Sequence, residues 1–209
     1  MLQVNKLGRS IAIEPDPDNF RMLDHNVVQN GFGDRVVRVH CAVSAQEGEL
    51  ELERSSVNFG DHRIRMVPQG DVSEAHDESK RSTVRVPARR VDDILRDTPA
   101  AFVRDIAFVW IDVQGHEGYA FQGAEDLLAR DVPVVAEFWP YGIRRAGMTE
   151  AEFNAIARRF WSGYWLQEGS GASKKFVHYP ITHLERLFAE IGYNDSKTTN
   201  KACNIIFTK

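Results

Sequence analysis

The stretch Ser10-Ile-Ala-Ile-Glu-Pro-Asp-Pro-Asp-Asn19 decides the fold. Its apolar run, Ile11 to Ile13, lies next to turn-forming residues and predicts a short buried strand. The two prolines that follow have no N–H to donate to a strand ladder, so we expect the strand to end at Glu14. Asp18 then predicts the N-cap of a helix. The stretch therefore predicts the first strand and helix of an α/β unit.

Glu14 is the candidate functional residue of this stretch. A carboxylate at the C-terminal end of a buried strand, beside the start of a helix, is where α/β nucleotide-binding folds hold a ribose. The alternative is a solvated glutamate in a strand–helix loop. Taken alone, the residue favours that alternative, and the later strands shift the balance towards ribose binding.

Composition bounds the class of protein. The 209 residues are 43% hydrophobic and 27% charged, with a formal net charge of -4, which is typical of one globular domain over residues 1–209. This balance indicates no nucleic-acid partner. The two cysteines, Cys41 and Cys203, match neither a disulfide framework nor a zinc site, which favours the cytoplasm. No apolar run approaches the roughly 20 residues of a membrane span, so we expect no membrane association.

Two further apolar strands are predicted to end at an acid. Residues 106–111 form an uninterrupted apolar run before Asp112, and residues 132–136 precede Glu137. Uninterrupted runs predict strands that are buried on both faces in a parallel sheet. The carboxyl ends of such strands line the ligand crevice of an open sheet, so we expect these acids to gather there with Glu14. Acids are also common as helix caps.

The rest of the chain alternates predicted strands and helices, which is typical of a doubly wound α/β domain. Residues 70–82 are polar and predict a surface loop, with His76 as a solvated side chain. Further predicted features are a strand at 49–53, helix caps at Asp92 and Thr149, a helix that ends at Gly192, and a strand at 203–208.

Four motifs, taken in order, resemble one family. They are Ile-Glu-Pro-Asp-Pro-Asp-Asn-Phe (13 to 20), Val-Asp-Asp-Ile-Leu (91 to 95), Ile-Asp-Val-Gln-Gly-His-Glu (111 to 117) and Gly-Ala-Glu-Asp-Leu-Leu (123 to 128). From about residue 10 to about residue 140 the chain resembles the FkbM-type S-adenosylmethionine-dependent methyltransferases. The resemblance implies a class I methyltransferase (Rossmann-like) fold with a seven-stranded, mostly parallel sheet. It also implies O-methylation of a hydroxyl on a small molecule or sugar.

The resemblance implies roles for particular residues. Glu14 would hold the ribose hydroxyls of the cofactor, S-adenosylmethionine. Ala42 and Val43 would flank the adenine, and Asp112 would face the methyl-transfer site. These four positions are therefore the predicted cofactor-binding residues.

The chain departs from the family pattern in three ways. Gln114 stands where the family usually has glutamate, and Trp110 stands where lysine is common. No strand followed by Asp-x-Gly-x-x-x-Gly precedes residue 10, although a nucleotide fold places its glycine-rich turn roughly 20 residues before the ribose acid. In the family that segment is the central strand, and its loss would expose apolar strand edges. We expect either an N-terminally truncated form of a longer protein, which we favour, or a remnant that has lost tight cofactor binding.

Methyl transfer to a hydroxyl requires an aligned oxygen and the removal of a proton. His116 is a candidate base because imidazole titrates near neutral pH, although a plain position in the first turn of a helix explains it equally well. Asp112 is the other candidate catalytic residue. Glu117 and Glu137 are candidates for binding substrate hydroxyls, but a first-turn glutamate is also a favourable partner of the helix dipole.

Weaker signals for a binding or metal site come from a predicted loop, two aromatic residues and the histidines. Asn58 and His62 lie on a predicted loop that is able to reach the crevice. Trp139 and Tyr141 are able to stack on a sugar ring, but core packing is the commoner use of such residues. The histidines show no metal-ligand spacing, so we predict no metal site.

Two other functions stay open. An inactive methyltransferase remnant would act as an interaction module, bind through its open sheet and form a homodimer, without binding the cofactor. A nicotinamide-dependent dehydrogenase also uses a ribose acid, but it explains the motif at 111–117 less well.

Overall fold

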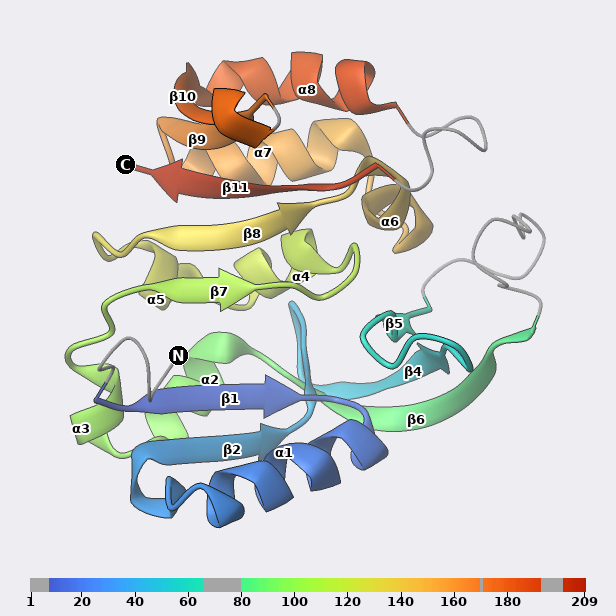
Figure 1. Cartoon of the computed structure of the whole chain (residues 1–209), viewed down its shortest axis with the longest axis vertical. Helices are drawn as coiled ribbons and strands as arrows, with labels where there is room; N and C mark the ends of the chain where they lie inside the picture. The colour runs from blue at the N-terminus through green and yellow to red at the C-terminus, as the bar shows by residue number, and fades with distance from the viewer. Residues whose placement is uncertain (1–7, 66–79, 170, 193–200) are drawn as a thin grey trace.

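The structure is a computed structural model that describes residues 8–65, 80–169, 171–192 and 201–209. Residues 70–79 of the predicted polar loop, with His76, lie outside the described residues, and its last residue, Ser82, begins a strand. Strands and α-helices alternate in the later part of the chain, but among the described residues five strands follow one another between residues 36 and 89 (Figure 1). Among the described residues, none of the helices is both long and apolar enough to cross a lipid bilayer.

The strands are short, and several match the predicted runs. Their bounds are β1 (Ser10–Glu14), β2 (Val36–His40), β3 (Ala42–Val43), β4 (Gly48–Arg54), β5 (Arg63–Ile64), β6 (Ser82–Arg89), β7 (Val109–Ile111), β8 (Val134–Phe138), β9 (Gly163–Glu168), β10 (Lys175–Pro180) and β11 (Cys203–Thr208). The helices are α1 (Pro17–Gln29), α2 (Val91–Asp97), α3 (Ala100–Val103), α4 (Glu117–Gln122), α5 (Glu125–Leu128), α6 (Pro140–Arg145), α7 (Glu150–Phe160) and α8 (Leu184–Ile191).

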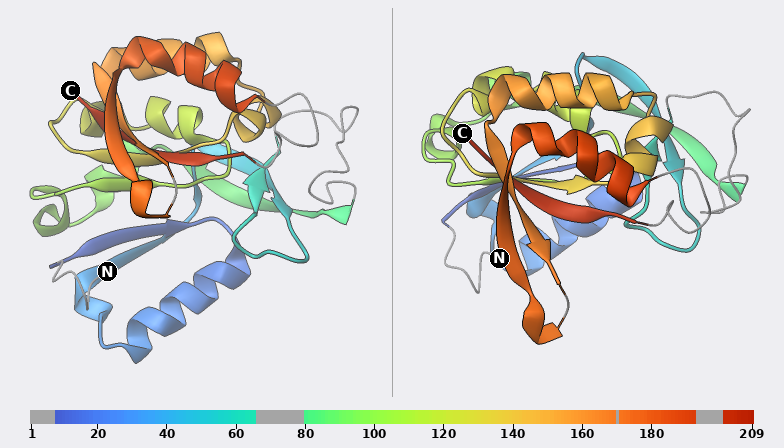
Figure 2. Two further views of the ribbon diagram at one scale, coloured as in Figure 1. Left: turned by 45° about the horizontal axis from the view of Figure 1, so that its top comes forward. Right: turned by 90° about the horizontal axis from the view of Figure 1, so that it is seen from above.

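These strands form three separately hydrogen-bonded sheets. One is the parallel pair β1-β2, one is five-stranded with the order β10-β9-β11-β8-β7, and one is four-stranded with the order β3-β6-β4-β5. In the five-stranded sheet β7 and β8 are parallel, whereas β11 is antiparallel to both of its neighbours. Figure 2 shows the β9–β10 hairpin projecting from the rest of the molecule. The predicted α/β class is confirmed, but a single doubly wound, mostly parallel sheet is not.

The break in the sheet lies between β1 and β7. Figure 1 shows the two strands pointing in the same direction, with β2 beyond β1 and β8 beyond β7. Among the described residues no strand ladder joins β1 to β7. Each of these strands is therefore the edge of its own sheet, and its backbone groups on that side have no ladder partner there.

This arrangement explains why two burial predictions are wrong. Every residue of β1 is only partly buried, although the sequence predicted a buried strand. Trp110 in β7 is 51% exposed, although its apolar run predicted burial on both faces. A strand at the edge of a sheet is covered on fewer sides than a central one, so apolar sequence alone does not bury it.

The helix caps correct two further predictions. Asp16, not Asp18, caps α1, and its carboxylate accepts hydrogen bonds from the backbone N–H groups of residues 18 and 19. Asp92 lies inside α2, and its carboxylate instead accepts hydrogen bonds from the first turn of α5. The predicted capping box between Thr149 and Glu152 at the start of α7 is confirmed.

The main hydrophobic core lies around the five-stranded sheet. Fully buried aromatic side chains pack edge to face or tilted against one another between α4, α7, α8 and the strands; they include Phe121, Phe138, Phe153 and Phe188. A second, smaller cluster lies in the four-stranded sheet and includes Leu52. Neither cluster includes a buried side chain from β1, α1 or β2.

Candidate functional site

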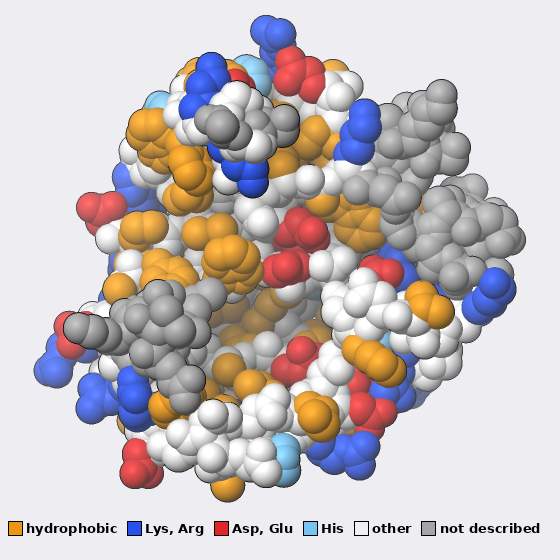
Figure 3. Space-filling model, in the orientation of Figure 1, with side chains coloured by type: hydrophobic (Ala, Val, Ile, Leu, Met, Phe, Trp, Pro, Cys, Tyr) orange, Lys and Arg blue, Asp and Glu red, His pale blue; other side chains and the backbone are white. Residues whose placement is uncertain are grey.

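One cavity, of about 150 Å³, lies where the ends of several strands meet. Its wall is formed by the end of β1, the turn between β2 and β3, the β4–β5 hairpin and the segment after β7. In Figure 3 the visible face of the molecule has a hollow near its centre. Acidic side chains lie on either side of the hollow, and hydrophobic side chains lie deeper in it. The lining therefore combines carboxylates with apolar surface, which is typical of small-molecule sites.

Most of the predicted site residues line this one cavity. Glu14, Ala42, Val43, Asp112 and His116 come from three separate segments and meet there. The other two predicted residues, both glutamates, are absent from the described lining. The fold thus brings together positions that are about 100 residues apart in the sequence, and their roles stay predictions.

Glu14 lies at the tip of β1. Its Oε1 atom accepts a hydrogen bond from the backbone N–H of Asp16 at 2.8 Å. Partial burial raises the pKa of this carboxyl, and a hydrogen bond from the N–H of Asp16 opposes that rise. One carboxylate oxygen is thus held by the turn, which orients the group towards the cavity that it lines.

The end of β7 carries a bridge between two acids. The Nε2 atom of Gln114 donates to Oδ1 of Asp112 at 2.6 Å and lies 3.3 Å from Oε2 of Glu137 at the end of β8. Gln114 has a φ of 54°, a left-handed backbone conformation that is uncommon for residues other than glycine. A glutamate at this position would add a third negative charge, whereas the amide supplies a donor between the two carboxylates.

The two glutamates outside the cavity have raised pKa values. Burial raises the pKa of Glu117 to about 8, and its Oε1 accepts hydrogen bonds from the N–H groups of Val113 and Gly115. Burial, followed by the charge of Asp112, raises the pKa of Glu137 to about 7. Glu117 therefore holds the turn after β7, and a substrate contact for either glutamate stays a prediction.

His116 is a buried side chain on the cavity wall. Its Nε2 lies 3.1 Å from Oγ of Ser44, and its ring stacks on Tyr119 with the centroids 4.6 Å apart. Burial lowers the pKa of His116 to about 4, so the ring is neutral at physiological pH. The neutral form is the one a base needs, but the observed contacts are those of a packed core side chain.

The loop between β4 and β5, residues 55–62, forms the wall opposite β1. Its apex is a tight turn in which Asn58 accepts a hydrogen bond from the N–H of Gly60 at 3.0 Å. Phe59 and His62 from this loop line the cavity. Asn19 from α1 also lines the cavity. The sequence predicts only a weak signal at His62 and none at Phe59 or Asn19, because the tertiary structure alone brings this hairpin beside β1 and α1.

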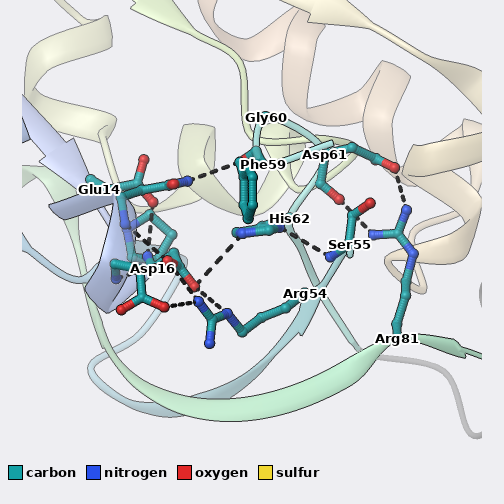
Figure 4. Close-up of polar contacts among 12 residues, drawn as sticks. Glu14, Asp16, Arg54, Ser55, Phe59, Gly60, Asp61, His62 and Arg81 are labelled. Carbon is teal, nitrogen blue, oxygen red and sulfur yellow. Dashed lines mark hydrogen bonds and ion pairs between the residues drawn. The ribbon is translucent and has the colours of Figure 1, made fainter. Parts of the chain in front are cut away.

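A charged network ties this loop region to the start of α1 (Figure 4). Nε of Arg54 pairs with the buried carboxylate of Asp16 at 2.7 Å. Nε2 of His62 lies 3.8 Å from the same carboxylate, while its Nδ1 accepts the N–H of Ser55 at 3.1 Å. On the far side of the loop, Arg81, which immediately precedes β6, pairs with Asp61. The loop is therefore anchored at both of its ends.

The remaining predicted signals lie outside the cavity. Trp139 and Tyr141 are buried, as expected for core packing, and Arg63 lies over the Trp139 ring at 5.2 Å. In the described parts of the chain, no group of three or more His, Cys, Asp or Glu side chains is placed to hold a metal ion.

The sequence matches the Methyltransferase FkbM domain over residues 1–193. The chain belongs to the FkbM methyltransferase family. This assignment agrees with the resemblance inferred from the four motifs, and it covers nearly the whole chain rather than their span alone. Comparison of this FkbM domain with curated proteins gives no match.

Among solved structures, the FkbM domain is similar to the crystal structure of methyltransferase FkbM from Methylobacillus flagellatus KT. The two share 19% sequence identity over 65% of this chain and 28% of that one, with a TM-score of 0.40. A likeness at this score does not by itself establish a common fold. The FkbM domain described here spans little more than a quarter of the length of that protein.

Proposed function

We propose that this chain binds S-adenosylmethionine at the cavity and transfers its methyl group to a hydroxyl of a small molecule or sugar. The observation that carries the proposal is the convergence of Glu14 and Asp112, from the ends of β1 and β7, on one cavity with Ala42 and Val43. Family membership supports the methyltransferase class. The cofactor, the oxygen acceptor and the roles of these residues are the proposal.

The residues present fit an adenosine. Glu14 offers a carboxylate acceptor for two ribose hydroxyls, and Ala42 and Val43 offer an apolar surface for a purine. The cavity holds about 150 Å³, whereas small-molecule sites commonly measure roughly 300–1,000 Å³. The enclosed part is therefore smaller than a whole cofactor, and part of a bound cofactor would extend into the open hollow of Figure 3.

The chemistry assigned to this chain is positioning and proton removal. S-adenosylmethionine supplies an electrophilic methyl group when it is bound. Asp112 is exposed at the end of β7 and is the side chain to which we assign the proton of the acceptor hydroxyl. Gln114 holds Asp112 in place and links it to Glu137. His116 is assigned to packing beside Ser44 rather than to proton transfer.

Calorimetric titration with S-adenosylhomocysteine tests the proposal without a known acceptor. We expect micromolar binding by the wild type and a loss of at least about tenfold in Glu14→Gln, because hydrogen bonds to a charged group contribute about 1.5–3 kcal/mol. The substitution to glutamine keeps an oxygen for the N–H of Asp16. Glu51→Gln, on the exposed part of β4, is the matched control and keeps wild-type affinity.

Three results of the titrations would change the proposal. A folded wild type that does not bind S-adenosylhomocysteine overturns the proposal for these 209 residues. Binding of NADH with equal or higher affinity favours the dehydrogenase interpretation instead. Equal affinity in Glu14→Gln and wild type removes Glu14 from the site while leaving the cofactor class in place.

One observation favours a second candidate function, that of an interaction module. Among the described residues, β1 and β7 present edges without a ladder partner, and unpaired edges are the sites at which sheets add strands from other chains. A module of this kind forms stable dimers and does not bind S-adenosylhomocysteine. Sedimentation equilibrium beside the titration separates the two candidates: a monomer that binds the ligand excludes the module.

A further inference from the structure

Phe59 is a large apolar side chain that lies on the cavity wall and yet is 65% exposed. Single exposed apolar residues are common on protein surfaces, so exposure alone does not indicate a binding site. Val57, two residues earlier in the same loop, is 76% exposed and does not line the cavity. What distinguishes Phe59 is how firmly its backbone is held beside the cavity.

Two hydrogen bonds hold the backbone around Phe59, and one ring contact involves its side chain. Its carbonyl oxygen accepts a hydrogen bond from Nδ2 of Asn19 in α1 at 2.9 Å. On the next residue, the N–H of Gly60 donates to Oδ1 of Asn58 at 3.0 Å, which closes the turn. The Phe59 ring also meets the His62 ring edge on, with centroids 6.1 Å apart. Figure 4 labels Phe59, Gly60 and His62 of this loop.

Asn19 couples Phe59 to the predicted ribose acid. Its side chain holds the Phe59 carbonyl, and it also interacts with the carboxylate of Glu14 through a hydrogen bond that opposes the rise in the carboxyl's pKa. One side chain in the first turn of α1 therefore links the carboxylate of Glu14 to the backbone of Phe59. Hydrogen bonds that hold contact residues in place before the ligand binds reduce the entropy lost on binding.

Beside its polar side chains, the cavity lining also contains aliphatic ones. Ala42 and Val43 come from the β2–β3 region, and Leu52 and Ile64 come from the hairpin that carries the loop. An exposed aromatic face beside aliphatic surface suits a flat, π-bearing group, because aromatic rings favour offset stacking. A purine is such a group, and it is attached to the sugar that the proposed site places on Glu14.

We propose that Phe59 stacks on the purine ring of the bound cofactor, and that Asn19 positions it at the correct distance from the ribose acid. This inference rests on the proposed function, because it assumes that the cavity binds an adenosine group. It assigns the β4–β5 loop to cofactor recognition, a segment outside the four motifs from which the family was inferred.

The test is titration of wild type, Phe59→Ala and the control Val57→Ala with S-adenosylhomocysteine and, separately, with adenosine. Loss of base–aromatic stacking raises Kd by roughly 5- to 150-fold, the equivalent of about 1–3 kcal/mol per base. We expect the same factor for both ligands, because both contain the purine. Val57→Ala stays at the wild-type affinity for both.

Two conservative variants of Phe59 distinguish the loss of stacking from local unfolding of the loop. Phe59→Trp keeps a stacking face and retains affinity, whereas Phe59→Leu keeps apolar bulk and loses most of the affinity that alanine loses. Thermal unfolding of each variant checks that the fold persists. Asn19→Ala weakens both ligands less than Phe59→Ala does, because it removes positioning and not the ring.

The possible failures are distinguishable. If the folded wild type does not bind S-adenosylhomocysteine, the proposed function fails and this inference fails with it. If the wild type binds and Glu14→Gln weakens binding, but Phe59→Ala matches Val57→Ala, only the role of Phe59 is overturned. A loss confined to S-adenosylhomocysteine, with adenosine unaffected, also overturns it, because the ring then contacts another part of the ligand.

Discussion

Glu117 shows how burial at a single residue changes the chemistry of the motif at 111–117. The side chain is completely buried, and one of its oxygens is committed to two backbone N–H groups of the turn. Its other oxygen, Oε2, has no hydrogen-bond partner among the described residues. An ionised carboxylate in this position is costly, so the folded protein favours the protonated acid.

The raised pKa of Glu117 predicts a loss of stability as the pH rises. The pKa is about 8 in the folded protein against an ordinary value of 4.5, so the favourable contribution is complete below about pH 4.5 and is lost as the pH rises through about 8. Within that window the loss is at most about 1.4 kcal/mol per pH unit. Glu117→Gln cannot ionise. The unfolding free energy of this variant minus that of the wild type therefore increases as the pH rises through this window.

Urea unfolding at several pH values measures this difference. Glu51→Gln, which changes an exposed glutamate, is the control and follows the wild-type pH profile. Parallel profiles for Glu117→Gln and wild type would show that Glu117 is ionised in the folded protein.

At the scale of elements, two helix starts use the same cap chemistry with different connections. Thr149 caps α7 through a capping box, and both residues of the box are exposed. Asp16 caps α1 but is fully buried and also pairs with Arg54 of β4. The first cap stabilises one helix, whereas the second joins the β1–α1 unit to the hairpin that carries the 55–62 loop.

We therefore predict unequal costs for the two caps. Thr149→Ala lowers the unfolding free energy by about 1 kcal/mol, the usual value for a cap. Asp16→Ala lowers it by roughly 2–4 kcal/mol, because it removes the cap and also the buried partner of Arg54. Asp16→Asn keeps the cap and separates the two contributions. Equal losses for the two alanine variants in urea unfolding would contradict this link between elements.

At the scale of the whole molecule, the packing is uneven. The main core surrounds the five-stranded sheet, whereas β1, α1 and β2 contribute no buried side chain to either hydrophobic cluster. The two-stranded sheet β1-β2 has no ladder to the rest of the described structure. Two-stranded sheets are marginal on their own, so this unit depends on α1 and on side-chain contacts such as the Asp16–Arg54 pair.

This asymmetry predicts unequal protection in native-state hydrogen exchange. The ladder amides of β1 and β2 open at a lower free energy than those of β8 and β11, which lie inside the five-stranded sheet and its core. Addition of S-adenosylhomocysteine raises protection at the end of β1 and in the 55–62 loop if the proposed site is correct. Equal protection of both sheets without ligand would show that the molecule unfolds as one unit.

Much of this protein was predictable from the sequence, for local physical reasons. The ends of β1 and β7 follow from apolar runs that stop at an acid, with prolines to end the first, whereas β8 continues past Glu137 to Phe138. The capping box of α7 follows from residue types at fixed spacing. The family follows from four motifs in order, and the match over residues 1–193 confirms it. The prediction of Asp18 as the cap of α1 is wrong, and Pro17 at the first helical position is the local signal that favours Asp16.

The tertiary structure alone decided which side chains are buried and which distant residues are in contact. It determined that the strands form three sheets, that β1 and Trp110 are partly exposed, and that His116 and Glu117 are buried. It also brought Phe59 and Asn19 into contact beside Glu14, across about 40 residues of chain. Periodicity and spacing report the conformation of a segment, because they depend on neighbours within a few residues. Exposure, pKa and cavity lining depend on which distant segments pack against that segment.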